Sequence, residues 1–373
     1  MRKTLPGLIA LAAVSTLALT ACSSDRTDNT AGATNTNTAA AGSELCIPVG
    51  ATIGVALPQK TSENWVLAEQ LFNDGLTAAG FEPIVQFGNS GVTEQQNQIE
   101  AMVEQGAAVI VVGAIDGSQL GTQLEAAKAS GATVIAYDRL VKNTEAVDAY
   151  IAFDNYQVGV LQGTALLQGL AERKGDGPYN IELIAGSSDD ANSIPFFEGA
   201  MSILQPKIDD GTLTVVSGQT TFEQVATQGW KAENAQKRMD TVLSGFYSGD
   251  TAIDGILSPN DTLARAALVA VAQAGKDTPV ITGQDSEVES VKSIVAGEQY
   301  STIYKDTRDL VAQTIASIVA LQNCDEIPIN DTEQYNNGVK VVPAYLLEPK
   351  IVTQANAAEV YANDPTLGPL TAG

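Results

Sequence analysis

Residues Ala51–Phe87 have the sequence ATIGVALPQKTSENWVLAEQLFNDGLTAAGFEPIVQF. The apolar run Ala51–Leu57 predicts a strand covered on both faces, because continuous aliphatic and β-branched residues are typical of parallel sheets. Apolar residues at helical spacing follow over Trp65–Ala79, and a second run of strand type occupies Glu82–Phe87. The stretch therefore predicts a strand, a crossover helix and a parallel strand.

The same alternation continues toward the C-terminus in two series. The first series contains a helix at Glu94–Gln105, a strand at Val109–Val112, a helix near Leu120–Ser130 and strands at Thr133–Tyr137 and Ala149–Phe153. After a helix at Val158–Ala171, the second series contains Ile181–Ala185, Phe196–Leu204, Leu213–Ser217, Ala232–Ser244, Gly255–Ser258, Thr262–Ala274, Val280–Gly283, Val288–Ala296 and Ser301–Tyr304. Two such series predict an α/β protein with two doubly wound, Rossmann-like domains.

The composition excludes several classes of function. The chain of 373 residues has 20 Lys and Arg against 44 Asp and Glu, a formal net charge of -24, and no histidine. Catalysis that depends on imidazole is therefore excluded, and the negative charge disfavours nucleic acid and anionic lipid as partners. No glycine-rich or Walker nucleotide motif follows the first strand, and no acidic run has calcium-loop spacing. We expect no cofactor and no metal.

The N-terminus has the pattern of an export signal. Two basic residues precede an apolar run over Leu8–Ala21, which is short for a membrane span. The run ends in LTAC, residues 19–22, which resembles the bacterial lipobox, where the cysteine is lipidated and becomes the new N-terminus. We expect residues 1–21 to be a signal peptide and Cys22 to carry the lipid. A transmembrane anchor with a chance cysteine is the less favoured alternative.

A tether and a pair of cysteines follow. Ser23–Ser43 contain no large apolar side chain and cannot bury enough surface to offset the entropy of ordering, so we expect a flexible tether over residues 22–46. With Cys22 lipidated, Cys46 and Cys324 remain. An even pair in an exported protein predicts a disulfide, with two free buried cysteines as the alternative.

Polar residues follow five of the predicted strands directly. The pairs are Asp138-Arg139, Asp154-Asn155, Asn260-Asp261, Gln284-Asp285 and Lys305-Asp306. In open α/β sheets, ligands bind in the crevice beyond the carboxyl ends of the strands. Five polar strand ends therefore predict a cleft lined by these side chains.

A family resemblance is carried by these same segments in order. They are Tyr137-Asp138-Arg139-Leu140, Phe153-Asp154-Asn155, Ser258-Pro259-Asn260-Asp261, Gly283-Gln284-Asp285 and Tyr304-Lys305-Asp306. Together they resemble the type I sugar-binding proteins of ABC import systems, in the group of xylose-binding proteins and multiple-sugar-binding receptors. The resemblance extends over about Ile47–Val352.

The resemblance implies a domain arrangement. Two lobes would be joined by three crossing segments near Phe153–Asn155, Tyr304–Arg308 and Asn337–Pro343. The first lobe would contain residues 47–153 and 307–337, and the second lobe residues 154–306 and 338–365. This division places both Cys46 and Cys324 on the first lobe, which supports the disulfide.

The binding site is expected to suit a polyol. Each sugar hydroxyl donates and accepts hydrogen bonds, and sugar C–H faces pack on aromatic rings, so such a site needs carboxylates, amides, basic donors and aromatic walls. The resemblance adds that both tryptophans stand where the family stacks an aromatic ring on the sugar. The expected ligand-binding residues are Asn64, Trp65, Asp138, Arg139, Asn155, Asn192, Trp230, Asn260, Asp285 and Lys305.

One position departs from the family. The xylose-type relatives carry arginine directly before the first tryptophan, whereas this chain has Asn64. Asparagine cannot form the two-pronged contact of a guanidinium group, so the preferred sugar does not carry over from these relatives.

Each candidate also has a structural interpretation. Trp65 could be a core residue of its helix, Asp138 and Arg139 could form a strand-end salt bridge, and Asn192 could close a turn. Asp261 and Asp306 could cap the helices that follow them.

The expected function is capture without chemistry. The chain would be a lipid-anchored extracytoplasmic monomer that binds an aldopentose or aldohexose, such as xylose, glucose or galactose, between its lobes. Its partners would be the membrane permease subunits of an ABC importer, and it would not be an enzyme. A receptor for another polyol or a furanosyl signal molecule is the alternative. A glycosidase built on paired carboxylates is less favoured, and a DNA-binding repressor is disfavoured because an export signal stands where a helix-turn-helix would precede the lobes.

Overall fold

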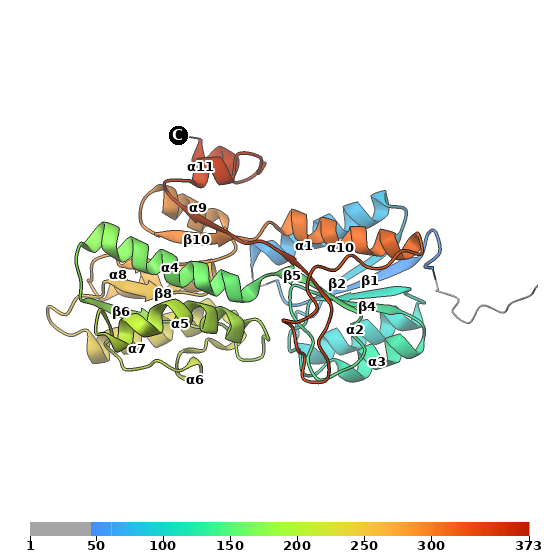
Figure 1. The fold of residues 1–373 in the computed structure, drawn as a ribbon, viewed down its shortest axis with the longest axis horizontal. Coiled ribbons are helices and arrows are strands. Elements are labelled where there is room, and N and C mark those ends of the chain that lie inside the picture. Colours follow the sequence, from blue (N-terminus) through green and yellow to red (C-terminus); the bar gives the residue numbers. More distant parts are fainter. Residues whose placement is uncertain (1–45, 61, 373) are drawn as a thin grey trace, which may run out of the picture. The chain divides into compact units, whose positions relative to one another are not determined.

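A computed structural model describes residues 46–60 and 62–372. The expected signal peptide, Cys22 and all but the last residue of the tether lie outside the described residues. Within the described part, two parallel sheets are each covered by helices, which confirms the α/β class of two doubly wound lobes (Figure 1). Among the described residues, no helix is both long and apolar enough to cross a membrane.

The first lobe is built on a six-stranded parallel sheet. Its strand order is β11-β5-β4-β3-β1-β2. The strands are β1 (Thr52–Leu57), β2 (Glu82–Phe87), β3 (Val109–Val112), β4 (Thr133–Tyr137), β5 (Ala149–Phe153) and β11 (Ala344–Leu347). The covering helices are α1 (Glu63–Ala78), α2 (Val92–Glu104), α3 (Gly121–Ala129) and α10 (Thr307–Gln322). Every residue of β3 and β5 is buried, as continuous apolar strands require.

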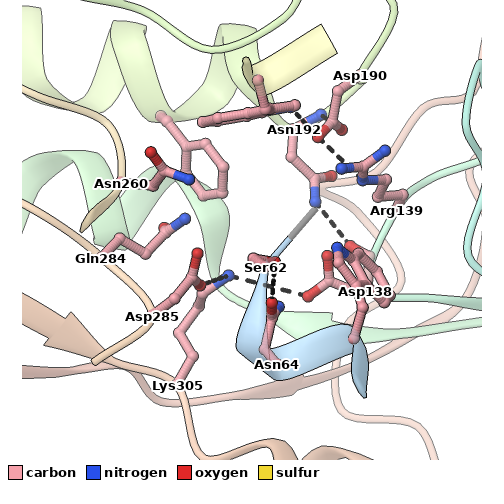
Figure 2. Close-up of a pocket in the computed structure, with 13 residues that line it drawn as sticks. Ser62, Asn64, Asp138, Arg139, Asp190, Asn192, Asn260, Gln284, Asp285 and Lys305 are labelled. Atoms are coloured by element: carbon pink, nitrogen blue, oxygen red, sulfur yellow. Dashed lines mark hydrogen bonds and ion pairs between the residues drawn. The ribbon is translucent and has the colours of Figure 1, made fainter. Parts of the chain in front are cut away.

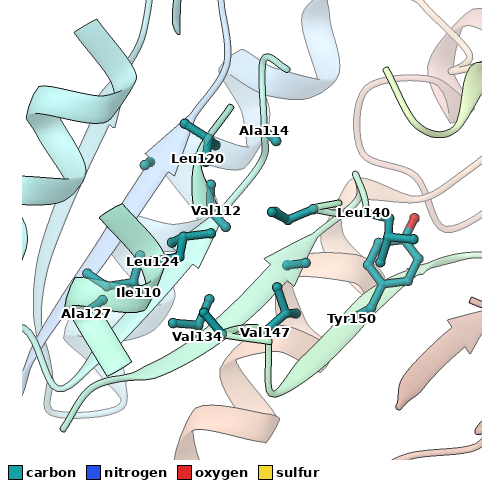
Figure 3. Close-up of a cluster of buried hydrophobic side chains, with 14 of the residues drawn as sticks. Ile110, Val112, Ala114, Leu120, Leu124, Ala127, Val134, Leu140, Val147 and Tyr150 are labelled. Carbon is teal, nitrogen blue, oxygen red and sulfur yellow. The ribbon is translucent and has the colours of Figure 1, made fainter. Parts of the chain in front are cut away.

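Helices cover both faces of this sheet (Figure 1). Helices α1 and α10 pack side by side over one face, and α2 and α3 lie over the other. Leu124 and Ala127 of α3 pack against Ile110 and Val134 of the sheet in a core with no exposed side-chain surface at these positions (Figure 3). This packing holds the carboxyl ends of β3 and β4 in fixed positions.

The second lobe repeats the same strand order on a smaller scale. Its four-stranded parallel sheet has the order β7-β6-β8-β9. The strands are β6 (Tyr179–Leu183), β7 (Leu213–Val215), β8 (Gly255–Leu257) and β9 (Val280–Ile281). The helices are α4 (Asn155–Lys174), α5 (Ser193–Asp209), α6 (Phe222–Val225), α7 (Ala232–Phe246) and α8 (Asp261–Gln273), with a 3-10 turn at Gln228–Trp230. In both sheets the order reverses beside the first strand of the series, where such folds place their ligands.

A short antiparallel pair completes the second lobe. It joins β10 (Ser301–Tyr304) to β12 (Lys350–Thr353). Helix α9 (Val288–Val295) packs on β10, and α11 (Ala357–Val360) packs on β12. Helix α12 (Gly368–Thr371) packs on α9 and α11. The backbone of β10 also bonds to the segment after β9, where Asp285 N donates to Ile303 O at 2.9 Å.

Helices α4 and α5 approach each other closely because glycines face each other at their crossing. A Cβ on Gly159 would lie 2.0 Å from the carbonyl oxygen of Phe196, and one on Gly199 would lie 2.1 Å from that of Tyr156. Helix α4 begins directly after β5 of the first lobe, and α5 begins beside the cavity described below. The glycine contact therefore couples the junction of the lobes to the position of α5.

The chain passes between the sheets after β5, after β10 and after β11. The last passage corrects the expected domain boundary. Residues 338–347 were expected in the second lobe, but β11 pairs with β5 in parallel register, Ala344 opposite Tyr150. Asn337 also donates to the backbone oxygen of Thr144 at 2.8 Å. The third passage therefore lies between Leu347 and Lys350. The boundary was predicted wrongly because the sequence of an apolar strand does not reveal which sheet edge the strand joins.

Cys46 and Cys324 form a disulfide with their Cα atoms 4.8 Å apart. Cys46 precedes β1, and Cys324 lies just beyond the last turn of α10. Backbone bonding accompanies the bridge, since Ile47 N donates to Leu321 O at 3.4 Å. The disulfide therefore belongs to the first lobe.

Candidate functional site

A small cavity of about 30 Å³, partly open to solvent, lies where the two sheets present their strand ends. Its lining comes from both lobes (Figure 2). The residues are Ser62, Asn64, Trp65, Asp138, Arg139, Asp190, Asn192, Phe196, Trp230, Asn260, Gln284, Asp285 and Lys305. The structure thus brings together nine of the ten expected binding residues.

Two aspartates enter the cavity from opposite lobes with unusual backbone conformations. Asp138 follows β4 with φ 60°, and Asp285 follows β9 with φ 89°. Trp230, which also lines the cavity, has φ 55°. Such values are rare for residues with a Cβ and are concentrated at functional sites. The backbone therefore directs these side chains at some cost in strain.

Lys305 connects the two aspartates. It follows β10, and its Nζ lies 3.2 Å from Asp285 Oδ1 and 3.9 Å from Asp138 Oδ2. Burial alone would lower the pKa of Lys305, but Asp285 and Asp138 outweigh it, so the pKa is raised. Lys305 is therefore a fixed cation between carboxylates of both lobes.

A second ion pair crosses the cavity. Arg139 Nε lies 3.1 Å from Asp190 Oδ2, and both side chains are largely buried. Asp190 also accepts from Trp230 Nε1 at 3.1 Å and from the backbone nitrogen of Asn192 at 2.9 Å. Burial raises the pKa of Asp190 although Arg139 opposes the shift. The strand-end salt bridge that was the alternative interpretation of Asp138 and Arg139 is not present; each pairs with another residue.

Asn192 and Asn155 occupy different layers. Asn192 lines the cavity and donates to Asp138 O at 2.7 Å, and its Oδ1 accepts from Tyr150 Oη at 3.1 Å. Asn155, expected as a binding residue, does not line the cavity. It is 2 % exposed in the first turn of α4 and donates to Tyr150 Oη at 3.0 Å. Because Asp154 caps α4, Asn155 is turned into the helix packing, where it supports Asn192 through Tyr150.

Aromatic rings form two walls. Trp65 is 4 % exposed, with the Arg139 guanidinium 5.3 Å from its ring centroid and Tyr137 packed edge-on at 6.1 Å. Trp230 is 9 % exposed and packs edge-on against Phe196 at 6.5 Å. Trp65 is therefore both a core residue of α1 and a wall of the cavity, so its two interpretations do not exclude each other.

The second-lobe wall carries two amides. Asn260 caps α8, accepting from Leu263 N at 3.0 Å through Oδ1, so its amide nitrogen is the part that can contact a ligand. Gln284 points into the cavity between Asn260 and Asp285 (Figure 2). The Gln284 Oε1 atom is buried without a hydrogen-bond partner among the described residues.

Two further acids flank this wall without lining it. Asp261 is completely buried and accepts from Glu287 N at 2.9 Å and Thr302 Oγ1 at 3.0 Å. Asp306 caps α10 by accepting from Arg308 N at 2.9 Å. The capping interpretation holds for Asp306, whereas Asp261 lies one residue past the cap and ties β10 to the start of α9.

Four lining residues were not predicted as binding residues: Ser62, Asp190, Phe196 and Gln284. Gln284 lies beside Asp285 in one of the polar strand ends, so the signal was present. Asp190 lies in the same polar loop as Asn192. Ser62 and Phe196 carry no sequence signal of their own, because a serine before a helix and an apolar residue inside one are both ordinary.

The acidic residues of the cavity are paired with basic residues. Among residues 46–60 and 62–372, no three His, Cys, Asp or Glu side chains are grouped to hold a metal ion. The carboxylates of the cavity face Lys305 and Arg139 instead.

Comparison with known proteins identifies the family. Residues 53–325 match the family described as periplasmic binding protein domain. The chain belongs to this family. The family consists of receptors that bind solutes outside the cytoplasm, and the two lobes confirm the expected type I fold.

Three relatives show how close the match is. This binding protein is 46 % identical to the multiple sugar-binding periplasmic receptor ChvE of Rhizobium radiobacter, over 83 % of this chain and 88 % of that protein. It is 34 % identical to the D-xylose-binding periplasmic protein of Escherichia coli, over 84 % and 89 %. An ABC transporter solute-binding protein from Clostridium phytofermentans, solved with bound β-D-glucose, has 38 % identity and a TM-score of 0.81, covering 84 % of this chain and 98 % of that chain.

Proposed function

We propose that this protein is the extracytoplasmic binding component of an ABC sugar importer and captures one monosaccharide in the cavity. The observation that carries the proposal is the lining itself. Carboxylates, amides, a lysine and an arginine from both lobes surround a small space that has tryptophan walls. This combination matches a ring of hydroxyl groups with apolar faces. The relatives that bind multiple sugars, D-xylose and glucose support the same ligand class.

The charges of the cavity favour a neutral ligand. Lys305 is already paired with Asp285 and approaches Asp138, and Arg139 is paired with Asp190. Both cations have carboxylate partners, so a ligand carboxylate or phosphate would have to displace one of these pairs. A neutral aldopentose or aldohexose can bond to the paired groups without separating them.

Capture is proposed to occur by closure of the lobes about the three passages between the sheets. The sugar shifts this equilibrium only as far as it binds the closed form more tightly than the open form. Contacts from both sides of the cavity provide this difference. The closed form would then be the one that the membrane permease recognises.

We propose no catalytic role. A glycosidase needs a carboxylic acid and a carboxylate placed on either side of a glycosidic bond. Here both strand-end aspartates face Lys305, which holds them as hydrogen-bond acceptors. We expect the bound sugar to be recovered unchanged after long incubation.

Attachment to the membrane is proposed through Cys22, and the protein is proposed to act as a monomer. The support for lipidation is the LTAC sequence at residues 19–22. A Cys22→Ser variant should therefore move from the membrane fraction to the soluble exported fraction. Retention of this variant in the membrane fraction would contradict the anchor but not the sugar site.

A calorimetric and thermal-shift screen of neutral pentoses and hexoses tests the proposal. We expect at least one aldose to give a saturable heat with one site per chain and to raise the melting temperature. Trp230→Ala, which removes one wall, should weaken that binding. If no pentose or hexose gives heat or a thermal shift, the proposed function is wrong.

A further inference from the structure

Gln284 stands apart from the other polar residues of the cavity. Its side chain is 3 % exposed and lines the cavity. Eight buried side-chain atoms in the described part of the chain lack a hydrogen-bond partner, and Gln284 Oε1 is the one among them that belongs to a lining residue. Native proteins rarely leave a buried acceptor unsatisfied without a reason. The position of the Gln284 side chain in the cavity wall points to a ligand as the missing partner of its amide.

The neighbours of Gln284 are already engaged by the protein. Asn260 uses its Oδ1 to cap α8, and Asp285 is paired with Lys305. Figure 2 shows Gln284 between these two residues with its amide nitrogen at the end that faces the cavity. Because the carboxylate keeps Lys305 whether or not a sugar hydroxyl is present, loss of one hydroxyl there is partly compensated. No such compensation exists at the Gln284 amide, whose side-chain atoms have no hydrogen-bond partner among the described residues.

We propose that Gln284 is a specificity-determining residue that receives one hydroxyl group of the sugar. The inference rests on the proposed function and makes it narrower. The ligand must be a neutral sugar with a hydroxyl at the ring position that faces the second-lobe wall. A deoxy sugar lacking that group leaves the amide unsatisfied, and a site built around such a polar group rejects such analogues strongly.

A cycle of variants and ligands tests the assignment. Unmodified protein and Gln284→Met, which has similar length and no hydrogen-bonding group, are titrated with D-glucose, D-galactose, D-xylose and their monodeoxy analogues. We expect the unmodified protein to lose about tenfold to a hundredfold in affinity at one deoxy position because of the unsatisfied amide. Gln284→Met should bind that analogue and the parent sugar with equal affinity. It should still bind the analogues that lack a hydroxyl at other positions more weakly than the parent sugar.

Two controls separate a contact from a general disturbance. Gln284→Glu keeps an acceptor and should keep the discrimination at that position. Gln123→Met removes another amide whose Oε1 lacks a partner, in α3 and outside the cavity lining, and should change no sugar affinity. Thermal unfolding checks that each variant is folded.

The outcomes distinguish this inference from the proposed function. Failure of the unmodified protein to bind any of these sugars would overturn both. Binding in which Gln284→Met and the unmodified protein show the same loss at every deoxy position would overturn the inference alone. An equal weakening by Gln284→Met of the parent sugars and of every deoxy analogue would also overturn it, because a structural residue without a ligand contact predicts that result.

Discussion

The positive charge of Lys305 balances the carboxylates of two other residues. Its ammonium group lies between Asp285 and Asp138, which come from different lobes, and the side chain is 7 % exposed. Removing one member of a buried ionic cluster leaves the remaining charges unpaired, which costs more than the pair itself contributes. The lysine therefore supports both the cavity and the fold.

Lys305→Met should lower the free energy of unfolding by about 3 kcal/mol and abolish sugar binding. Lys128→Met is the matched control, because Lys128 pairs with Asp148 at 2.7 Å on the surface, with 39 % of its side chain exposed. Exposed pairs contribute at most about 1 kcal/mol, so this control should be nearly neutral. Urea unfolding measures both, and equal effects of the two variants would contradict the role of Lys305.

At the residue scale, the sequence predicted those site residues that directly follow a strand. Asp138, Asn260 and Asp285 were predicted because each lies just after the carboxyl end of an apolar run that forms a strand. Asn155 also follows such a run but is turned into α4, since a strand end that leads directly into a capped helix buries its next residue. The partners of each residue were not predictable: that Arg139 meets Asp190 depends on how the two lobes meet.

At the element scale, a carboxylate of the first lobe caps a helix of the second lobe. Glu63, the first residue of α1, accepts from the backbone nitrogen of Val288 at 2.9 Å. Val288 begins α9, whose free N–H groups and dipole favour a negative charge at this end. The bond forms only where α1 and α9 approach each other, so it would stabilise the closed form in the proposed capture by lobe closure.

Glu63→Gln should weaken sugar binding by about 0.5–1 kcal/mol, seen mainly as faster release, because the closed form loses a charged cap. Stopped-flow measurement of sugar dissociation tests this. Glu69→Gln, on the same helix, removes a carboxylate that pairs with Lys60 at 2.8 Å and forms no hydrogen bond or ion pair with α9 in the described structure. A dissociation rate that Glu69→Gln changes as much as Glu63→Gln would contradict the cap.

The contact between α4 and α5 gives a second prediction at this scale. Gly159→Ala would place a methyl group 2.0 Å from the carbonyl oxygen of Phe196, so the helices must separate. We expect a loss of about 1–3 kcal/mol in stability, as for overpacked cores, and weaker sugar binding because Phe196 moves with α5.

Gly245 in α7 provides the matched control. A Cβ there meets no atom within 4 Å, and Ala is the better helix former. Gly245→Ala should therefore leave stability unchanged or raise it by up to about 1 kcal/mol. Chemical denaturation that shows Gly159→Ala to be as stable as Gly245→Ala would contradict the close crossing.

At the scale of the whole molecule, two acids whose pKa values are shifted in opposite directions contribute to the pH dependence of stability. Burial raises the pKa of Asp261 well above its usual range, and Glu287 and Asp285 add to the shift. For Asp364, burial works in the same direction, but Arg308 and two backbone N–H groups lower the pKa to about 2. A raised carboxyl pKa makes the folded state gain stability as the pH falls through it, whereas Asp364 contributes stability that is lost between about pH 4 and 2.

Asp261→Asn should therefore reduce the gain in stability as the pH falls toward the ordinary carboxyl range, because the variant has no proton to take up. Its amide can replace the carboxylate, since Gln299 Oε1 can accept from it after rotation of the Gln299 amide, which gives up the bond from Gln299 Nε2 to Ser301 O. Urea unfolding at several pH values measures the profile. A gain in stability over this range equal to that of the unmodified protein would show that Asp261 does not titrate as described.

The two-lobe fold was predictable because its signal is local and repeated: each apolar run is followed by a helical pattern. The membership of β11 was not, because strand pairing depends on which sheet edge is free. Parallel pairing with β5 decides it. The same limit applies to the cavity, whose residues come from segments more than two hundred positions apart along the chain.

The central claim is that a sugar is held by both lobes at once. Asp138→Asn and Asp285→Asn test it as a matched pair, because each aspartate has a positive φ that asparagine tolerates and each faces Lys305 from a different lobe. Isothermal titration of both variants with the aldose that binds the unmodified protein should show at least about tenfold weaker binding for each, since a charge-assisted hydrogen bond is lost on either side. Full affinity in either variant would mean that one lobe binds the sugar alone, and the account of capture between the lobes would be wrong.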